Sequence, residues 1–158
     1  MGVRTSSALA QEREGAVKKL AQMTLPSVKT EAYRYTAIKG LPWETIERSD
    51  SALNVSFQFE GVPQNQQEMQ RQKYKALGVV MGAASEIPST MIESVPIEGM
   101  DYLDCLGLST WRNGYGIYVP SGVRVEEPIR VHVIGHGSQS SRAWLWMGAG
   151  SRLSVFEV

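Results

Sequence analysis

Residues 115–133, which read YGIYVPSGVRVEEPIRVHV, decide the fold of this chain. Apolar and polar residues alternate in two runs along this stretch, and a period of two predicts half-buried strands. Pro120 and Gly122 bracket a tight turn between the first strand and the next. Pro128 lacks a backbone N–H and therefore marks a strand start or a bend. Strands joined by such corners predict one rung of a parallel β-solenoid, in which each rung packs on its neighbours.

The C-terminal residues predict a second rung. Strands are expected over 143–147 and 151–158, joined by a turn at Gly148-Ala149-Gly150. Residues 144–147 are all apolar, a pattern typical of a strand buried on both faces. Val158 falls within strand-like sequence, so two rungs would leave open strand edges. We therefore expect either an N-terminal fragment of a longer protein or a partner that covers this end, since repeat arrays need about three units and caps.

The first residues predict a helix over 1–23. Its apolar residues recur at spacings of three and four, with Ala16 and Val17 on the resulting stripe. Charged and polar residues, Glu12 among them, occupy the opposite face. This pattern indicates a solvated helix that packs along one narrow stripe.

The remaining elements complete the predicted fold class. A short strand is expected at 55–59, and helices are expected at 67–76 and 100–111. The chain is therefore predicted to be α+β, with a helical and irregular N-terminal region over 1–111. The start of a parallel β-solenoid (β-helix) is predicted over 112–158.

Composition excludes several classes of function. The 158 residues correspond to about one domain. Sixteen basic and sixteen acidic residues cancel, so no basic field favours nucleic acid or an anionic membrane surface. No apolar run approaches the roughly 18 residues that span a bilayer. The lone cysteine, Cys105, excludes an internal disulfide framework and fits a reducing compartment.

Two motifs resemble one protein family. Residues 119–123, VPSGV, and 125–129, VEEPI, are similar to the opening rung of the SufD/SufB family, where the pattern is roughly V-P-K-G-V followed by K-P-I. Ser121 and Glu127 stand where that family usually has lysine. These proteins are scaffold subunits of the SUF system for iron–sulfur cluster assembly.

The second motif lies between the first helix and the next. SufD-like proteins carry a segment resembling L-P-x-x-K-x-E-x-W-R-Y-T, and Tyr33 stands here at the tryptophan position. The matching residues are Leu25, Pro26, Lys29, Glu31, Arg34, Tyr35 and Thr36. The helix expected before the first rung and the short N-terminal region resemble SufD more than SufB. From its aromatic and charged residues we expect this segment to fasten the helical region to the solenoid, rather than to bind a ligand.

The resemblance implies a non-catalytic scaffold subunit. Such a subunit pairs with a SufB-like homologue and binds a SufC-like ABC ATPase, in the bacterial cytoplasm or the plastid stroma. In that family the ATPase docks on a C-terminal helical region, and the cysteine and histidine residues implicated in assembly lie in later rungs. This chain has neither, so we carry over no catalytic, cofactor-binding or metal-binding residue. We expect the cluster to be handled by the full complex and not by this chain alone.

The residues with chemical potential favour structural roles. Cys105 lies among leucines, where cysteine behaves as a small buried apolar residue. One thiol also cannot hold an iron–sulfur cluster, because a cluster usually takes four ligands. His132 and His136 have no nearby cysteine or carboxylate as a third ligand. Two imidazoles alone are a weak match to a structural zinc site. Asp101 and Asp104 fall in the first turn of a predicted helix. The segment 148–151 lacks the lysine and helix of a phosphate-binding loop, so a turn is expected there.

Two other classes of function stay open. A β-solenoid acyltransferase would need repeated hexapeptides of aliphatic–glycine type, and no such period is present. A stand-alone interaction module would use its open strand edge as a docking site, and this edge would also permit self-association. The size of the protein in solution distinguishes these alternatives, because a docking edge favours a dimer or heteromer.

Overall fold

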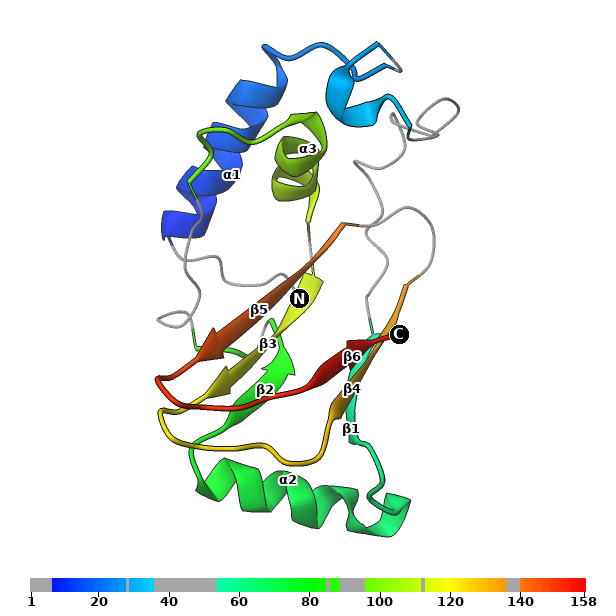
Figure 1. Cartoon of the computed structure of the whole chain (residues 1–158). Helices are drawn as coiled ribbons and strands as arrows, with labels where there is room; N and C mark the ends of the chain where they lie inside the picture. Colours follow the sequence, from blue (N-terminus) through cyan, green and yellow to red (C-terminus); the bar gives the residue numbers. More distant parts are fainter. Residues whose placement is uncertain are drawn as a thin grey trace.

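Figure 1 presents a computed structural model, which describes residues 7–27, 29–35, 54–84, 86–88, 96–111, 113–135 and 140–158. Its helices are α1 (Ser7–Leu20), α2 (Gln67–Ala76) and α3 (Tyr102–Thr110), with 3₁₀ turns η1 (Glu31–Tyr33) and η3 (Gln64–Gln66). Its strands are β1 (Asn54–Phe59), β2 (Val80–Ala83), β3 (Asn113–Val119), β4 (Ile129–Ile134), β5 (Ser141–Met147) and β6 (Val155–Glu157). The helices predicted over 1–23, 67–76 and 100–111 are confirmed as α1, α2 and α3, and the strand predicted over 55–59 is confirmed as β1. Residues 1–6 of the first predicted helix lie outside the described residues.

The described strands form two mixed sheets of three strands each. One sheet has the order β1-β4-β6 and the other has the order β2-β3-β5. β1 pairs with β4, and β2 with β3, in antiparallel direction, whereas β3 with β5 and β4 with β6 are parallel. An isolated parallel bridge joins Arg124 and Arg152 between the sheets. Each sheet therefore combines one early strand with two strands from the C-terminal part of the chain.

The predicted parallel β-solenoid is wrong, although the α+β class holds. The described strands make two separate mixed sheets, not a coil of parallel rungs. The reason is that β1 and β2, which precede α3, complete the sheets by antiparallel pairing with β4 and β3. Alternation along a strand predicts which residues are buried, but it carries no information about the direction of the neighbouring strand.

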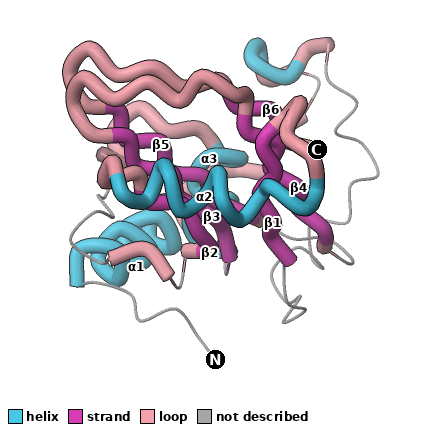
Figure 2. Tube along the Cα trace, turned by 90° about the horizontal axis from the view of Figure 1, so that it is seen from below, coloured by secondary structure: helices cyan, strands magenta, loops and turns pink. Residues whose placement is uncertain are grey.

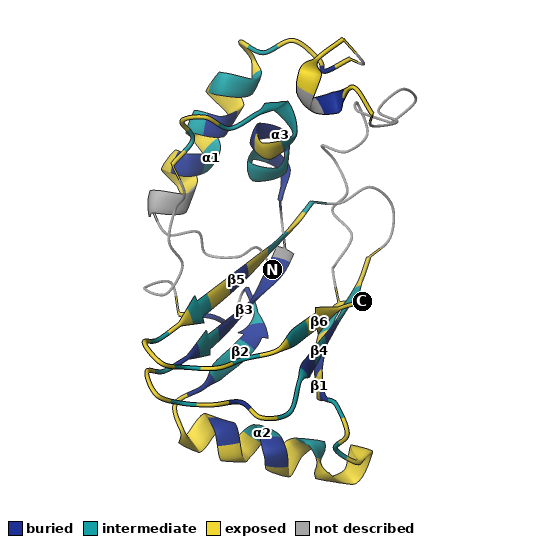
Figure 3. Ribbon diagram, in the orientation of Figure 1, coloured by how far each residue is buried: buried dark blue, intermediate teal, exposed yellow. Residues whose placement is uncertain are grey.

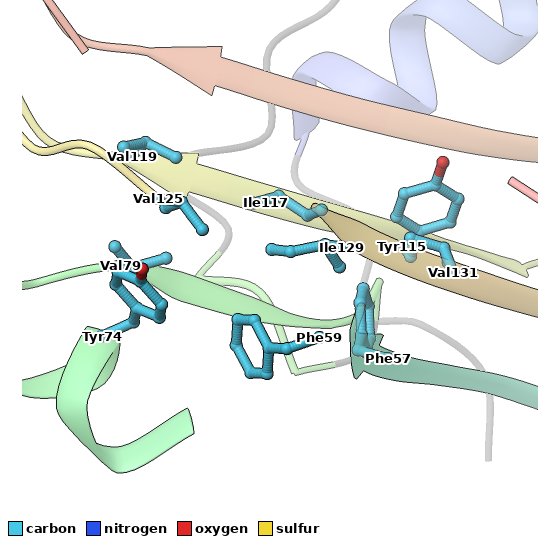
Figure 4. Close-up of a cluster of buried hydrophobic side chains, with 10 residues drawn as sticks. All are labelled: Phe57, Phe59, Tyr74, Val79, Tyr115, Ile117, Val119, Val125, Ile129 and Val131. Atoms are coloured by element: carbon cyan, nitrogen blue, oxygen red, sulfur yellow. The ribbon is translucent and has the colours of Figure 1, made fainter. Parts of the chain in front are cut away.

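The hydrophobic core lies between the two sheets (Figure 4). Ile117 and Val119 of β3 face Ile129 and Val131 of β4, and all four side chains have no exposed surface. Phe59 of β1 stacks on Tyr74 of α2, with ring centroids 5.5 Å apart. One face of β3 and one face of β4, the second predicted from its alternation, therefore point into a shared core.

Helix α2 closes one end of this core. Seen from below, it runs across the strands (Figure 2). The Gln67 side chain accepts a hydrogen bond from Phe59 N (2.8 Å) and donates to Phe59 O (2.9 Å). The Arg71 side chain donates to Phe57 O (3.3 Å). These side chains bond backbone groups on the outer edge of β1, as a further strand would otherwise do.

Helices α1 and α3 form a layer on the other side of the sheets. An Asp101–Asp104 capping box begins α3, which confirms the predicted place of both residues at the start of this helix. The Lys19 side chain of α1 donates to Ile97 O (2.7 Å), and Arg13 donates to Trp111 O (2.7 Å). Long-range hydrogen bonds therefore hold α1 against the chain around α3.

One prediction about α1 is wrong. Glu12, expected on the solvated face, is 6% exposed, whereas Val17, expected on the apolar stripe, is 50% exposed. The helix is turned in this way because the Glu12 carboxylate pairs with Arg142 of β5. A pattern of three- and four-residue spacings cannot reveal a partner 130 residues away.

Candidate functional site

The end of the molecule formed by β5 and β6 exposes apolar side chains. We call residues 141–158 the β5/β6 end. In Figure 3 its strands are mostly exposed or half-buried, whereas β3 and β4 are largely buried. The apolar residues exposed there by about half of their surface are Leu145 (51%), Met147 (46%), Phe156 (55%) and Val158 (58%). The prediction of a strand buried on both faces is therefore wrong for β5, in which only Trp144 is buried.

Two of these side chains lie on the core side of their sheet. Leu145 pairs with Ile117 and Met147 pairs with Val119 in the parallel β3–β5 register. Paired residues of neighbouring strands share a face, and Ile117 and Val119 belong to the core. The β5/β6 end therefore exposes part of the core side of its sheet, since about half of the surface of these two side chains is accessible.

The outer backbone edges of β5 and β6 are also open among the residues described. Gly148 N donates to Val119 O (2.8 Å), which directs the backbone groups of Met147 and Leu145 away from β3. Val158 N donates to Val131 O (2.9 Å), so Glu157 directs its backbone groups away from β4. Each strand is the last of its sheet. Such an edge is a template for pairing with another strand.

No protein-family model, no curated protein and no solved structure matches this chain.

Cys105 is fully buried in α3. Burial raises the pKa of its thiol, which keeps it protonated and unreactive at neutral pH. The position agrees with the predicted structural role among leucines.

The histidines do not form a described site. His132 lies on β4 opposite Ser56 of β1, and His136 lies outside the described residues. Within the described ranges, no group of three or more His, Cys, Asp or Glu side chains is arranged to hold a metal ion. In the same part of the chain, no helix combines the length and apolar character needed to cross a membrane.

The segment 148–151 forms the turn between β5 and β6, as predicted. Ser151 N donates to Gly148 O (3.0 Å), and Gly122 N donates to Ala149 O (2.9 Å). The turn therefore stacks directly on the preceding corner at 120–122. Gly150 has a φ of 69°, which favours glycine.

A buried charged junction joins the helices to the sheets. Arg142 Nη1 lies 2.8 Å from Glu12 Oε2, and their side chains are 13% and 2% exposed. The Arg142 guanidinium also lies 5.1 Å from the Trp144 ring centroid and 5.9 Å from that of Trp111. Trp111 and Trp144 pack edge to face, 5.4 Å apart. Sequence reasoning missed this junction because nothing in the local pattern links Glu12 to Arg142.

A shallow pocket of about 290 Å³ lies beside this junction. Its walls include Leu103, Leu108 and Trp111, and its polar lining includes Asp104 and Arg142. The two charged side chains already have structural roles, because Arg142 pairs with Glu12 and Asp104 caps α3. Ser140 and Ser141 also line the pocket, so its walls are polar and apolar in similar measure.

Tyr33 fastens the second sequence motif to α3. Its hydroxyl donates to the Asp101 carboxylate, and Tyr33 is 7% exposed. Burial and the neighbouring carboxylate raise the pKa of Tyr33 to about 12. The same hydrogen bond lowers the pKa of Asp101. The motif predicted to fasten the helical region to the solenoid therefore contacts the start of α3.

Replacing Tyr33 by phenylalanine is expected to cost about 1.5 kcal/mol of stability at neutral pH, because a hydrogen bond to a carboxylate is lost. The contribution from Asp101 is present above its unfolded pKa of about 4 and is lost as pH falls through the lowered folded value. The contribution from Tyr33 is present below about pH 10 and is lost as pH rises towards 12. Thermal unfolding across pH should therefore show the largest difference between about pH 4 and pH 10.

Tyr35→Phe is the matched control for this prediction, since Tyr35 lies in the same segment but is 94% exposed. It should leave the melting temperature unchanged at every pH. A Tyr33→Phe difference that did not depend on pH would mean that the phenol contributes through packing and not through the Asp101 carboxylate.

Proposed function

We propose that this chain is the N-terminal portion of a SufD-like, non-catalytic scaffold subunit that works in iron–sulfur cluster assembly through protein contacts. The family assignment is supported by the two motifs at residues 25–36 and 119–129. The observation that carries the scaffold role is the β5/β6 end, with its open strand edges and exposed apolar side chains. Exposed apolar surface next to unpaired strands favours protein association.

The polar contacts also support a scaffold. The Tyr33–Asp101 bond joins η1 to α3, and the Tyr74 hydroxyl of α2 bonds the Glu127 carboxylate. The Glu12–Arg142 pair joins α1 to β5. These described acids and phenols hold elements together, a use that favours a structural role over acid–base catalysis.

The partners follow from the resemblance. A SufB-like homologue and a SufC-like ABC ATPase are the expected subunits, and the iron–sulfur cluster is cargo of the complex. The bacterial cytoplasm or the plastid stroma is the compartment that fits such a complex. Cys105, buried in α3, supplies no ligand for the cluster in this proposal.

Binding to purified subunits tests the proposal. The chain is mixed with a SufB-like subunit, a SufC-like subunit or both, and complexes are separated by size exclusion with mass measurement. We expect a complex of fixed stoichiometry with the SufB-like subunit, and no ATP hydrolysis or stoichiometric iron and sulfide in the chain alone after anaerobic reconstitution. Failure to bind the SufB-like subunit, or a cluster held by the isolated chain, would contradict it.

A stand-alone interaction module is the second candidate. It is favoured by the same open β5/β6 end, which needs no SUF partner in order to bind a strand. The two candidates differ in the binding experiment, because a stand-alone module leaves the SufB-like and SufC-like subunits unbound.

A further inference from the structure

We propose that Arg124 and Arg152 form a docking site for a protein partner that presents two neighbouring carboxylates. The inference rests on the proposed function only in assigning protein contacts to this chain. It adds the place of one contact and the chemistry that the partner must bring to it.

Arg124 and Arg152 lie side by side. The segments that follow β3 and β5 run in parallel from one sheet to the other (Figure 1), and the two arginines are bridge partners there. Arg152 N donates to Val123 O (3.0 Å), and Val125 N donates to Arg152 O (2.9 Å). Neighbouring strands lie about 4.8 Å apart, so the two side chains begin at roughly that separation.

Both arginine side chains point away from the core. Val125 is 2% exposed, and Val123 and Leu153 also pack against the core. Successive side chains of an extended segment alternate in direction, so the arginines next to these residues point outward, and both are exposed. The pair does not depend on an open strand edge. A strand that paired with this segment would bond backbone groups in the plane of the sheet and leave outward-pointing side chains accessible.

Neither charge of the pair is neutralised. Among the described residues, Arg124 and Arg152 form no ion pair and no side-chain hydrogen bond. Every other arginine that the structure describes has a carboxylate or carbonyl acceptor, and these are Arg13, Arg34, Arg71, Arg130 and Arg142. Like charges directly opposite each other on neighbouring strands are destabilising. The pair therefore lowers the stability of the chain unless an anion binds to it.

The acids that follow Arg124 in the sequence do not supply this anion. The Glu127 carboxylate accepts a hydrogen bond from the Tyr74 hydroxyl. Glu126 is exposed on the same face as Arg124, but its side chain forms no ion pair within the described part of the chain. Two guanidinium groups and one carboxylate leave this face with a net positive charge.

The surroundings of the pair favour a protein over a small ligand or a nucleic acid. The adjoining turn residues Ser121, Gly122, Ala149 and Gly150 are all exposed, and neither arginine lines the pocket beside Arg142. Small ligands bind in concave sites that enclose them, which this face is not. Nucleic acids bind through many phosphate contacts, which two arginines in a chain of balanced charge do not provide.

Two carboxylates fit the spacing of the arginines. Glutamates at positions i and i+4 on one helix face lie about 5–6 Å apart, close to the separation at which the two arginine side chains begin. Each guanidinium can bind one carboxylate through two parallel N–H···O hydrogen bonds. We therefore expect the partner to present an acidic pair of this kind.

Side-chain NMR of the isotope-labelled chain tests the inference. A helical peptide with two glutamates four residues apart is titrated at low salt, and the arginine Nε–H signals are followed. The signals of Arg124 and Arg152 should shift together and saturate. The signal of Arg34, which is 55% exposed but paired with Glu31, is the internal control and should not shift. The same peptide with glutamine at both positions should shift none of these signals, and added salt should reverse the shifts.

Variants should change the affinity in opposite directions. Arg124→Gln/Arg152→Gln should raise the dissociation constant of the glutamate peptide about fivefold or more, because two exposed ion pairs are lost. Glu126→Gln should lower the dissociation constant, because it removes a carboxylate that repels the peptide. Arg34→Gln removes an exposed arginine away from the pair and should leave the dissociation constant unchanged.

Three results would overturn the inference. They are shifts at Arg124 and Arg152 no larger than the shift at Arg34, an unchanged dissociation constant in the double arginine variant, and tighter binding of inorganic phosphate than of the glutamate peptide. The last result would assign the pair to a phosphate group. If the double variant misfolds, the titration of the unmodified chain decides, since it compares arginines within one molecule.

The arginine site and the SUF assignment can fail separately, because the peptide titration uses no SUF subunit. A chain that binds the glutamate peptide but no SufB-like subunit would support this inference and contradict the proposed function. A chain that binds the SufB-like subunit but shows no shift at the arginine pair would do the reverse.

Discussion

Replacing Arg142 by methionine is expected to lower the free energy of unfolding by about 3–5 kcal/mol, the usual cost of removing one partner of a buried ion pair. The Glu12 side chain is 2% exposed, and the Arg142 guanidinium lies 2.8 Å from its carboxylate. The variant leaves that buried charge without Arg142 and also removes the contact of the guanidinium with Trp144. Urea unfolding followed by tryptophan fluorescence measures the loss.

The control is an exposed pair on the same side of the molecule. Arg34 and Glu31 lie 2.8 Å apart, but their side chains are 55% and 80% exposed. Arg34→Met should leave the unfolding midpoint unchanged, because solvent screens such pairs. The double variant Glu12→Leu/Arg142→Met should be more stable than Arg142→Met, since it removes the buried carboxylate together with the arginine. If the two arginine variants lost equal stability, the buried pair would not be the cause.

Replacing Gly148 by alanine is expected to destabilise the chain by about 3 kcal/mol, at the upper end of the range for overpacking. A Cβ at this position would lie 2.7 Å from both Pro120 C and Ser121 Cα, and it would also contact Ser121 N. These are backbone atoms of the preceding corner, and they cannot rotate away. The melting temperature measured by circular dichroism reports the effect.

Gly107→Ala is the matched control. Among the described residues, a Cβ there meets only Ser140 Oγ, at 3.5 Å, and the position is inside α3. The change should raise stability by up to about 1 kcal/mol, because alanine favours helix more than glycine does. Equal effects of the two substitutions would show that the close stacking of the corners at 120–122 and 148–151 has no energetic role.

Local sequence patterns predicted several of the elements. The alternation at 129–133 led to β4, a short strand was expected before the corner at 120–122 where β3 lies, and Asp101 and Asp104 marked the start of α3. The alternation at Val123 and Val125 gave no strand, only the isolated bridge at Arg124, and β2 was not predicted. The features that were predicted depend on neighbours within a few residues, which the sequence displays directly. The turn at 148–151 was predictable for the same reason, since glycine and serine favour turns.

The pairing of strands and the candidate site could not be predicted. Apolar residues at 144–147 have the composition of a buried strand, yet Leu145 and Met147 are half exposed because β5 is the outer strand of its sheet. The antiparallel pairing of β1 with β4 joins residues about 70 positions apart. Such contacts depend on the whole fold, and composition carries no record of which strand lies at an edge.

The closure of β1 by Gln67 and Arg71 has an evolutionary consequence. Hydrogen bonds between strands use backbone atoms, which every residue except proline supplies, so they survive most substitutions. The bonds that cover Phe57 and Phe59 depend on the identity of two side chains. A single nucleotide change at either codon would expose part of the outer backbone edge of β1 to pairing with another strand. Descendants of this chain should therefore keep these two residues, or lose them only together with a change in oligomeric state.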